Sequence, residues 1–249
     1  MKKYLSGFFT HKTDIGRVRM TNEDRAIALT NSKGNVLLLV CDGMGGQSKG
    51  DLASELASTY IAEEFRNKTG GFFNRATAIH WLKNVIRKAN TLVFNESCSK
   101  EEYQGMGTTL TAVLVAPNYL VIAQVGDSRA YILEDDSLNQ ITEDQTYVGY
   151  LMRTGQITYD EAKVHPKRHV LLNALGIYPA INIDIKAMNY DRQRILVCSD
   201  GLYNNLSHGD LENVLKNNDS VELKVSQLIR IANSNGGSDN IAVIIWEAN

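Results

Sequence analysis

The sequence lacks the features that would place the protein on a nucleic acid or in a membrane. Its 26 Lys and Arg residues are balanced by 28 Asp and Glu residues, giving a formal net charge of −2. Nucleic-acid-binding domains usually carry a basic excess, so we expect no nucleic acid partner. The short apolar stretch near the N-terminus is followed at once by His11, Lys12 and Asp14, and no apolar run is long enough to span a bilayer. We therefore expect no signal peptide, no membrane segment and a cytoplasmic location.

Cysteine is also scarce, and its positions give no framework for disulfides. Of the three cysteines, Cys41 and Cys198 lie inside apolar runs. There they are expected to behave as small buried hydrophobic residues in a reducing compartment. The sequence has no cluster of His and Cys residues with the spacing of a zinc site, so a thiolate or imidazole metal centre is not expected.

A chain of 249 residues is long enough for one large domain with a substantial core. It contains no internal repeat, linker or low-complexity tract, so we predict a single domain over residues 1–249. Apolar and β-branched segments follow one another directly, which favours antiparallel strands over alternating strands and helices. Strands are expected over residues 25–30, 36–41, 109–116, 119–125, 130–134, 138–142, 181–187, 194–198 and 241–246. Helices are expected over residues 52–65, 79–93 (with Asn74 as the cap), 210–216 and 221–233.

The segment from about residue 143 to 177 differs from the rest in having mixed polarity and no long periodic stripe. Two short helices are expected within it, over residues 146–153 and 159–163. Long irregular segments often carry recognition, so we interpret it as a flap near the functional edge. The alternative is a surface excursion without a role.

Two stretches share an unusual pattern, in which a buried strand ends in an Asp-Gly pair. One runs from Val36 to Asp42 and Gly43, and the other from Arg194 to Asp200 and Gly201. A strand end holds a carboxylate at a fixed point, so the pattern predicts two carboxylates converging on one site.

Asp127 and Asp239 occupy similar junctions, each next to Gly or Ser. Taken singly, such an aspartate is best explained as capping its own turn. Four at the same kind of position weaken that explanation, because like charges held close together need cations. Oxygen ligands alone favour Mg²⁺, Mn²⁺ or Ca²⁺. With an arginine nearby, such a site suits phosphate chemistry.

Six motifs in order give a more specific indication. They are residues 18–24 (VRMTNED), 41–46 (CDGMGG), 107–109 (GTT), 126–129 (GDSR), 199–201 (SDG) and 237–241 (GSDNI). Together they resemble the metal-dependent protein phosphatases of type 2C, and most of all the compact bacterial serine/threonine phosphatases. The resemblance runs from about Thr13 to the C-terminus. It implies an α+β fold with a central sandwich of two antiparallel β-sheets, flanked by helices on both sides.

The resemblance also implies a metal site for Mn²⁺ or Mg²⁺, with two and in some members three ions. Asp42 resembles the carboxylate that bridges two metals, and Gly43 the residue whose carbonyl is a ligand of the first. Asp200 and Asp239 resemble ligands of the second metal. Asp127 resembles a ligand of a third metal in bacterial members, with Asp200 shared.

Three further residues resemble the phosphate-binding arginine and two outer acids of the family. Glu23 and Asp24 resemble acids that hold metal-bound waters. Arg19 resembles the arginine, since it has the family's spacing to these acids, and Arg17 is its rival. The implied mechanism is direct attack on phosphorus by a hydroxide that bridges two metals, with Arg19 stabilising the phosphoryl oxygens.

Two departures from the family pattern bear on these roles. Met44 stands where many eukaryotic members have a histidine proposed to protonate the leaving oxygen, which methionine cannot do, so the general acid stays unassigned. Gln145 and His169 stand in the flap where relatives often have His and Asn, which bears on substrate choice.

The resemblance implies a protein phosphoserine/phosphothreonine phosphatase that acts as a monomer on phosphoproteins, including a cognate serine/threonine kinase. Two alternatives stay open at this stage. One is a catalytically weak regulatory relative that binds phosphoproteins, and the other is a phosphatase of small molecules.

Overall fold

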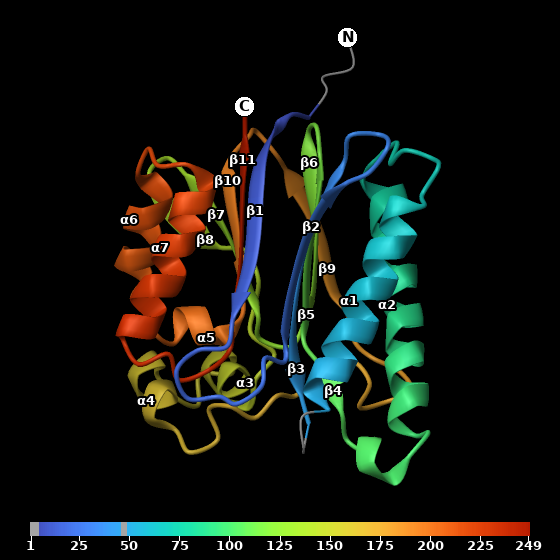
Figure 1. Cartoon of the computed structure of the whole chain (residues 1–249), viewed down its shortest axis with the longest axis vertical. Coiled ribbons are helices and arrows are strands. Elements are labelled where there is room, and N and C mark those ends of the chain that lie inside the picture. The colour runs from blue at the N-terminus through green and yellow to red at the C-terminus, as the bar shows by residue number, and fades with distance from the viewer. Residues whose placement is uncertain (1–4, 46–48) are drawn as a thin grey trace.

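The computed structural model describes residues 5–45 and 49–249. Two antiparallel β-sheets stack face to face, and a pair of helices covers the outer face of each sheet (Figure 1). The layers therefore follow the order α-β-β-α, which confirms the predicted fold class. Gly46, which the sequence places in the glycine-rich turn, lies outside the described residues.

Each sheet combines strands from distant parts of the chain. The first sheet has the order β1 (Gly7–Asp14), β11 (Ile241–Ala248), β10 (Arg194–Cys198), β7 (Arg129–Glu134) and β8 (Ser137–Gln140). The second has the order β2 (Asp24–Thr30), β3 (Val36–Met44), β5 (Leu110–Ala116), β6 (Tyr119–Val125) and β9 (Asp184–Asn189), with the short β4 (Gly107–Thr108) also pairing with β3.

Two long helices, α1 (Gly50–Arg66) and α2 (Arg75–Ser97), cover the second sheet, and α6 (His208–Lys216) and α7 (Val221–Ser234) cover the first. A short 3-10 helix follows α2 at Glu101–Tyr103. Three further helices lie at the end of the sandwich opposite the chain termini (Figure 1): α3 (Tyr147–Arg153), α4 (Tyr159–Val164) and α5 (Asp200–Tyr203). This end holds the loops discussed below.

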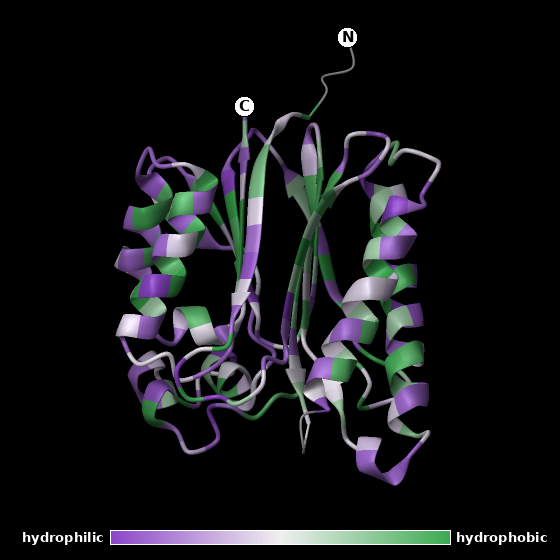
Figure 2. Cartoon of the chain, in the orientation of Figure 1, coloured by the Kyte–Doolittle hydropathy of each residue, from purple (hydrophilic) through white to green (hydrophobic). Residues whose placement is uncertain are grey.

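The core has three apolar layers because both faces of each sheet are covered. Along β3, Val36, Leu38 and Val40 pack against the other sheet. The alternate residues Leu37, Leu39 and Cys41 pack against α1 and α2. Such strands have nearly continuous apolar sequences, as Figure 2 shows for the central strands, whereas the helices alternate in hydropathy. Among the described residues, no helix is long and apolar enough to cross a membrane.

Most predicted elements are confirmed, and the differences have simple causes. Strand β9 begins at Asp184 and ends at Asn189, later than the predicted residues 181–187, because only this part pairs with β6. Strand β1 was not predicted, since it is an edge strand with a largely exposed polar half, paired with β11 alone. The predicted cap is confirmed, as the Asn74 side chain accepts a hydrogen bond from the backbone of Thr77 at 2.9 Å.

Candidate active site

A cavity of about 1020 Å³ opens at the end of the sandwich where α3, α4 and α5 gather. Seven of the eight predicted site residues line it: Arg19, Glu23, Asp42, Gly43, Asp127, Asp200 and Asp239. The eighth, Asp24, lies beneath the wall with a side chain that is almost fully buried. The structure thus brings together carboxylates that are up to 216 residues apart in the chain, counted from Glu23 to Asp239 (239 minus 23).

Asp42 lies near the end of β3, where side chains of the Thr108-Thr109 pair fix its backbone. The Asp42 N–H donates to Thr109 Oγ1 at 3.0 Å, and the Asp42 carbonyl accepts from Thr108 Oγ1 at 3.0 Å. Thr109 Oγ1 also lies 2.9 Å from Ser128 Oγ, which follows Asp127. These bonds explain the 107–109 motif, because they connect the chain that carries Asp42 to the turn that carries Asp127.

Gly43 is required by close backbone packing. A Cβ atom at this position would lie 2.0 Å from the Gly50 carbonyl oxygen and 2.7 Å from that of Glu23. The Gly43 N–H donates to the same Glu23 carbonyl at 3.0 Å. Any side chain here would therefore push the start of α1 and the Glu23 loop away from Asp42.

The turn that carries Asp127 is held from inside by Gln124. The Gln124 amide donates to the carbonyls of Gly126 at 3.0 Å and Ser128 at 2.6 Å. Gly126 has φ of +95°, a conformation that favours glycine, and a Cβ there would meet Thr109 at 2.7 Å. The Tyr203 hydroxyl donates to the Asp127 carbonyl at 3.1 Å. The turn is thus fixed on both sides of its carboxylate.

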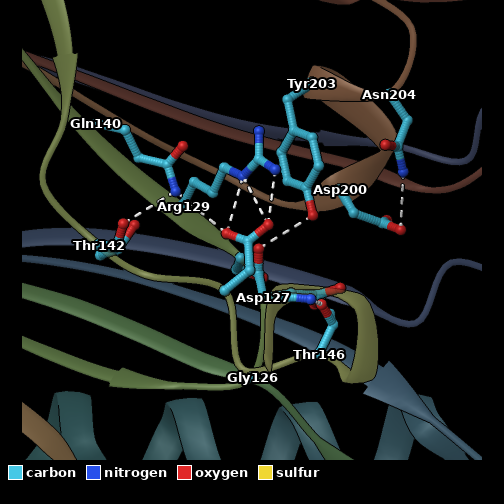
Figure 3. A network of polar contacts seen from close by, with 12 residues as sticks. Gly126, Asp127, Arg129, Gln140, Thr142, Thr146, Asp200, Tyr203 and Asn204 are labelled. Atoms are coloured by element: carbon cyan, nitrogen blue, oxygen red, sulfur yellow. Dashed lines mark hydrogen bonds and ion pairs between the residues drawn. The ribbon is translucent and has the colours of Figure 1, made fainter. Parts of the chain in front are cut away.

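Arg129 joins this turn to the flap and to α5 (Figure 3). Its guanidinium donates to Asp144 through three contacts of 2.6, 3.0 and 3.2 Å. It also lies over the Tyr203 ring, 3.6 Å from the ring centroid. Sequence reasoning included Arg129 in a motif but gave it no role, since its partner Asp144 lies in an irregular segment without a pattern of its own.

Asp239 and Arg19 form an ion pair across the mouth of the cavity, with Arg19 Nη2 2.7 Å from Asp239 Oδ2. The neighbouring Asn240 side chain holds the loop that carries Arg19. Its Nδ2 donates to the carbonyls of Ile15 and Thr21, both at 2.9 Å, and its Oδ1 accepts from the Glu23 N–H at 2.9 Å. Asn240 is therefore a positioning residue, which the sequence analysis included in the 237–241 motif without giving it a role. Arg17 does not line the cavity, which favours Arg19 as the arginine of the site.

Burial and mutual repulsion raise the pKa values of the clustered carboxyl groups. Burial raises the pKa of Asp24 to about 7, although a 2.6 Å hydrogen bond from Ser199 Oγ to this carboxylate opposes the rise. Burial, followed by repulsion from Asp239, raises the pKa of Asp200 to about 6. Burial and the charges of Asp24 and Asp200 raise the pKa of Asp42 well above its usual value. The cluster therefore resists full ionisation without a compensating charge.

The donor set fits hard divalent cations. All the carboxylates offer oxygen ligands, and their repulsion is the kind that a bound cation relieves. Glu23 Oε1 is buried without a hydrogen-bond partner, so it is an oxygen atom available for a water or an ion. Within residues 5–45 and 49–249, no three His, Cys, Asp or Glu side chains already stand in a metal-binding arrangement. One of the expected ligands, Asp239, is engaged by Arg19 at 2.7 Å.

A smaller cavity of about 540 Å³ lies between α1 and α2 and has different chemistry. Trp81 and Val85 are among its lining residues, together with Lys68, Lys88 and His80. His80 Nε2 lies 2.8 Å from the Asn84 side-chain nitrogen, consistent with an ordinary boundary residue. Glu64 is the one carboxylate among its lining residues in the described chain, so this cavity has no cluster of oxygen ligands.

Comparison with known proteins decides the family. The protein phosphatase 2C family profile matches residues 17–244. The chain belongs to the protein phosphatase 2C family. It is 37% identical to the serine/threonine phosphatase stp of Listeria welshimeri over 239 residues, which cover 96% of this chain and 94% of the relative. It is 29% identical to the protein phosphatase PhpP of Streptococcus pneumoniae strain D39, over 95% of this chain and 96% of the relative.

Solved structures of this family share the fold. The serine/threonine phosphatase Stp1 from Staphylococcus aureus superposes with a TM-score of 0.93 at 31% identity, covering 100% of this chain and 98% of that one. The catalytic domain of the phosphatase PstP, solved in complex with two manganese ions, has a TM-score of 0.86 at 32% identity, covering 98% and 99% of the two chains. These matches confirm the predicted resemblance to the bacterial type 2C phosphatases, as well as the enzyme class and its dependence on metal.

Proposed function

We propose that this protein is a metal-dependent serine/threonine protein phosphatase, which hydrolyses phosphoserine and phosphothreonine in proteins. The observation that carries the proposal is the gathering of buried and half-buried carboxylates from separate loops, with Arg19, around a single cavity. Family membership and the names of the relatives support the reaction class.

Asp42, the Gly43 carbonyl, Asp200 and Asp239 are the groups we assign to two metal ions. Asp127 is assigned to a third ion together with Asp200, and Glu23 and Asp24 to outer-sphere contacts with bound water. Mn²⁺ is the first choice, because a structural relative holds two manganese ions, and Mg²⁺ is the alternative. When bound, the ions supply positive charge for the phosphoryl oxygens and a more acidic water for attack on phosphorus.

Arg19 is assigned to the phosphoryl group. Its guanidinium is half exposed and faces the cavity while paired with Asp239 at 2.7 Å. A planar guanidinium binds two phosphoryl oxygens at once, so it orients the phosphate over the carboxylates and stabilises charge there. Met44 lines the same cavity and has no proton to donate, so the chain supplies no general acid at that position.

A phosphoprotein substrate is supported by the relatives, which are named serine/threonine phosphatases. The cavity volume of about 1020 Å³ leaves room for more of a substrate than its phosphoryl group. We further propose that one substrate is a cognate serine/threonine kinase, and that residues 1–249 act as one catalytic domain with a flap over residues 143–177. The monomeric state and the cytoplasmic location stay predictions.

The test is a comparison of substrates by the same Mn²⁺-loaded protein. A phosphothreonine peptide, a phosphotyrosine peptide and a sugar phosphate are assayed at equal concentrations by phosphate release. We expect the phosphothreonine peptide to have by far the highest kcat/KM. A higher kcat/KM for the sugar phosphate would favour the small-molecule alternative, and hydrolysis of none of them would favour the regulatory alternative.

A further inference from the structure

The smaller cavity, between α1 and α2, lies beside a long stretch of the chain that has no acidic residue. Residues 65–95 contain no Asp or Glu, and Glu64, just before them, is the one carboxylate among the lining residues in the described chain. The stretch carries six Lys or Arg residues: Arg66, Lys68, Arg75, Lys83, Arg87 and Lys88. Within residues 5–45 and 49–249, none of the six forms an ion pair. The end of α1 and most of α2 thus carry positive charge that the chain itself does not neutralise, although its net charge is −2.

Trp81 gives this cavity an aromatic surface in a fixed position. Its ring packs against Phe65 and Phe72, with ring centroids 5.9 and 5.2 Å away. Trp81 is only partly buried, and it lines the cavity beside Val85. An accessible indole ring that is already held by its neighbours favours contact with an apolar side chain, because little conformational freedom is lost when the contact forms.

Cationic side chains border the aromatic surface. Lys68 Nζ lies 5.0 Å from the centroid of the Phe72 ring. His80, Asn84 and Lys88 line the cavity from α2 at intervals of four residues, which places all three along one side of the helix. An occupant that joins an apolar side chain to carboxylates therefore matches both parts of the cavity.

The cavity between α1 and α2 is separate from the catalytic cavity. Helix α1 begins at Gly50, which packs against Gly43 of the candidate active site, and it is 17 residues long. At a rise of 1.5 Å per residue, its far end lies about 24 Å from Gly50. Glu64 and Lys68, which line the smaller cavity, lie near that far end, on the side of the molecule that carries the chain termini (Figure 1). A short peptide bound at the carboxylate cluster therefore does not reach them.

We propose that the cavity between α1 and α2 is a docking site for an acidic segment of a partner protein. The segment places a large apolar side chain against Trp81 and its carboxylates beside Lys68 and Lys88. A volume of about 540 Å³ is in the range of sites that enclose a ligand, and Trp is enriched among the residues that dominate binding at protein interfaces. A concave site suits an inserted side chain better than it suits a membrane surface, which favours a peptide over anionic lipid as the source of negative charge. The docking site does not depend on the proposed function, because it uses none of the residues of the catalytic cavity.

Tryptophan fluorescence tests the proposal directly. The chain has two tryptophans, and the other one, Trp246, is 2% exposed in the core, so a change in emission on adding a ligand reports on Trp81. Three short peptides are titrated: one with glutamates on both sides of two leucines, one with serines in place of the leucines, and one with lysines in place of the glutamates. We expect saturable binding of the first peptide, binding about tenfold or more weaker for the second because it buries no apolar side chain, and none for the third. Binding should weaken in about 1 M salt, where such charges are screened.

Charge reversal makes the test specific to this cavity. In Lys88→Glu, the dissociation constant of the first peptide should rise about three- to tenfold, and in the double variant Lys68→Glu/Lys88→Glu it should rise further. Arg230→Glu is the matched control, because Arg230 is an exposed cation on α7, which covers the other sheet. It should bind the peptide as the wild type does. A thermal melt checks that each variant is folded, and hydrolysis of a short phosphothreonine peptide should be the same in Lys88→Glu as in the wild type.

Several results would overturn the docking site. One is the lack of saturable binding of the first peptide up to about 1 mM. Another is equal affinity for the peptides with leucines and with serines, which would reduce the binding to attraction between charges. Unchanged affinity in the double variant would place the peptide elsewhere on the protein. Phosphatidylglycerol vesicles that change the Trp81 emission when the first peptide does not would replace the peptide with a membrane surface as the partner.

Discussion

The ion pair between Arg129 and Asp144 is expected to be a large contributor to stability, and replacing Arg129 with Met tests this. The side chains are 24% and 18% exposed, and the guanidinium both makes three contacts with the carboxylate and covers the Tyr203 ring. Removing one partner of a buried pair costs about 3–5 kcal/mol, and partial exposure favours the lower end of this range. We therefore expect the free energy of unfolding to fall by about 3 kcal/mol. For a chain of this size, that lowers Tm by roughly 6–12 °C.

A double-mutant cycle with Asp144→Asn isolates the interaction. The free energy of unfolding is measured by urea denaturation for wild type, the two single variants and the double variant. If the pair acts as described, the double variant should be more stable than the sum of the single losses predicts, by about 1–3 kcal/mol. Arg153→Met, which breaks an exposed pair at 3.6 Å, is the control and should cost less than about 1 kcal/mol. Additive losses in the cycle would show that the Arg129 and Asp144 side chains do not stabilise one another.

Three further predictions follow from the site. Arg19→Ala should raise KM for a phosphopeptide by about tenfold with Mn²⁺ affinity little changed, whereas Arg17→Ala should leave KM as it is; the reverse would assign the phosphate to the other arginine. Gly43→Ala should lose metal affinity, measured by calorimetry, because its Cβ would lie 2.0 Å from the Gly50 carbonyl; unchanged affinity would show that this packing is not needed. The pKa of Asp24 is about 7 in the folded protein, above its value in the unfolded chain, so its contribution to stability is greatest at low pH and is lost as pH rises. Tm of the metal-free protein should therefore fall between pH 4 and pH 8, and a rise in Tm over this range would contradict the assigned pKa shift.

The sequence predicted the strands that carry the site because they are buried on both faces. Continuous apolar runs such as residues 36–41 and 194–198 are stable only in the interior of a folded domain, and an aspartate follows each of them within two residues. The convergence of Asp42, Asp127 and Asp200 on one cavity was predicted from this repeated pattern. Strand β1 could not be predicted in the same way, because its outer half is polar and its pairing with β11 is a contact across the whole chain.

The hydrogen bonds and ion pairs that position the site residues could not be predicted from the sequence, because they join residues that are far apart in the chain. Asn240 and Arg129 act through partners far away in the sequence, such as the carbonyls of Ile15 and Thr21 and the carboxylate of Asp144. The spacing of apolar residues along the chain does not predict such contacts. A motif identifies Asn240 and Arg129 but does not predict which groups they bind. Asp24 is predicted to hold metal-bound water, and its side chain lies just behind the cavity wall, where Ser199 Oγ donates to its carboxylate.

The most direct test of the central claim is hydrolysis of a phosphothreonine peptide by metal-stripped protein, with and without Mn²⁺, beside the Asp200→Asn variant. We expect no activity without metal, full activity after Mn²⁺ is added, and a loss of about a hundredfold or more in kcat for the variant at saturating Mn²⁺. Near-normal turnover by Asp200→Asn, or activity that persists in the stripped protein, would contradict the assignment of the carboxylate cluster as a metal-dependent phosphatase site.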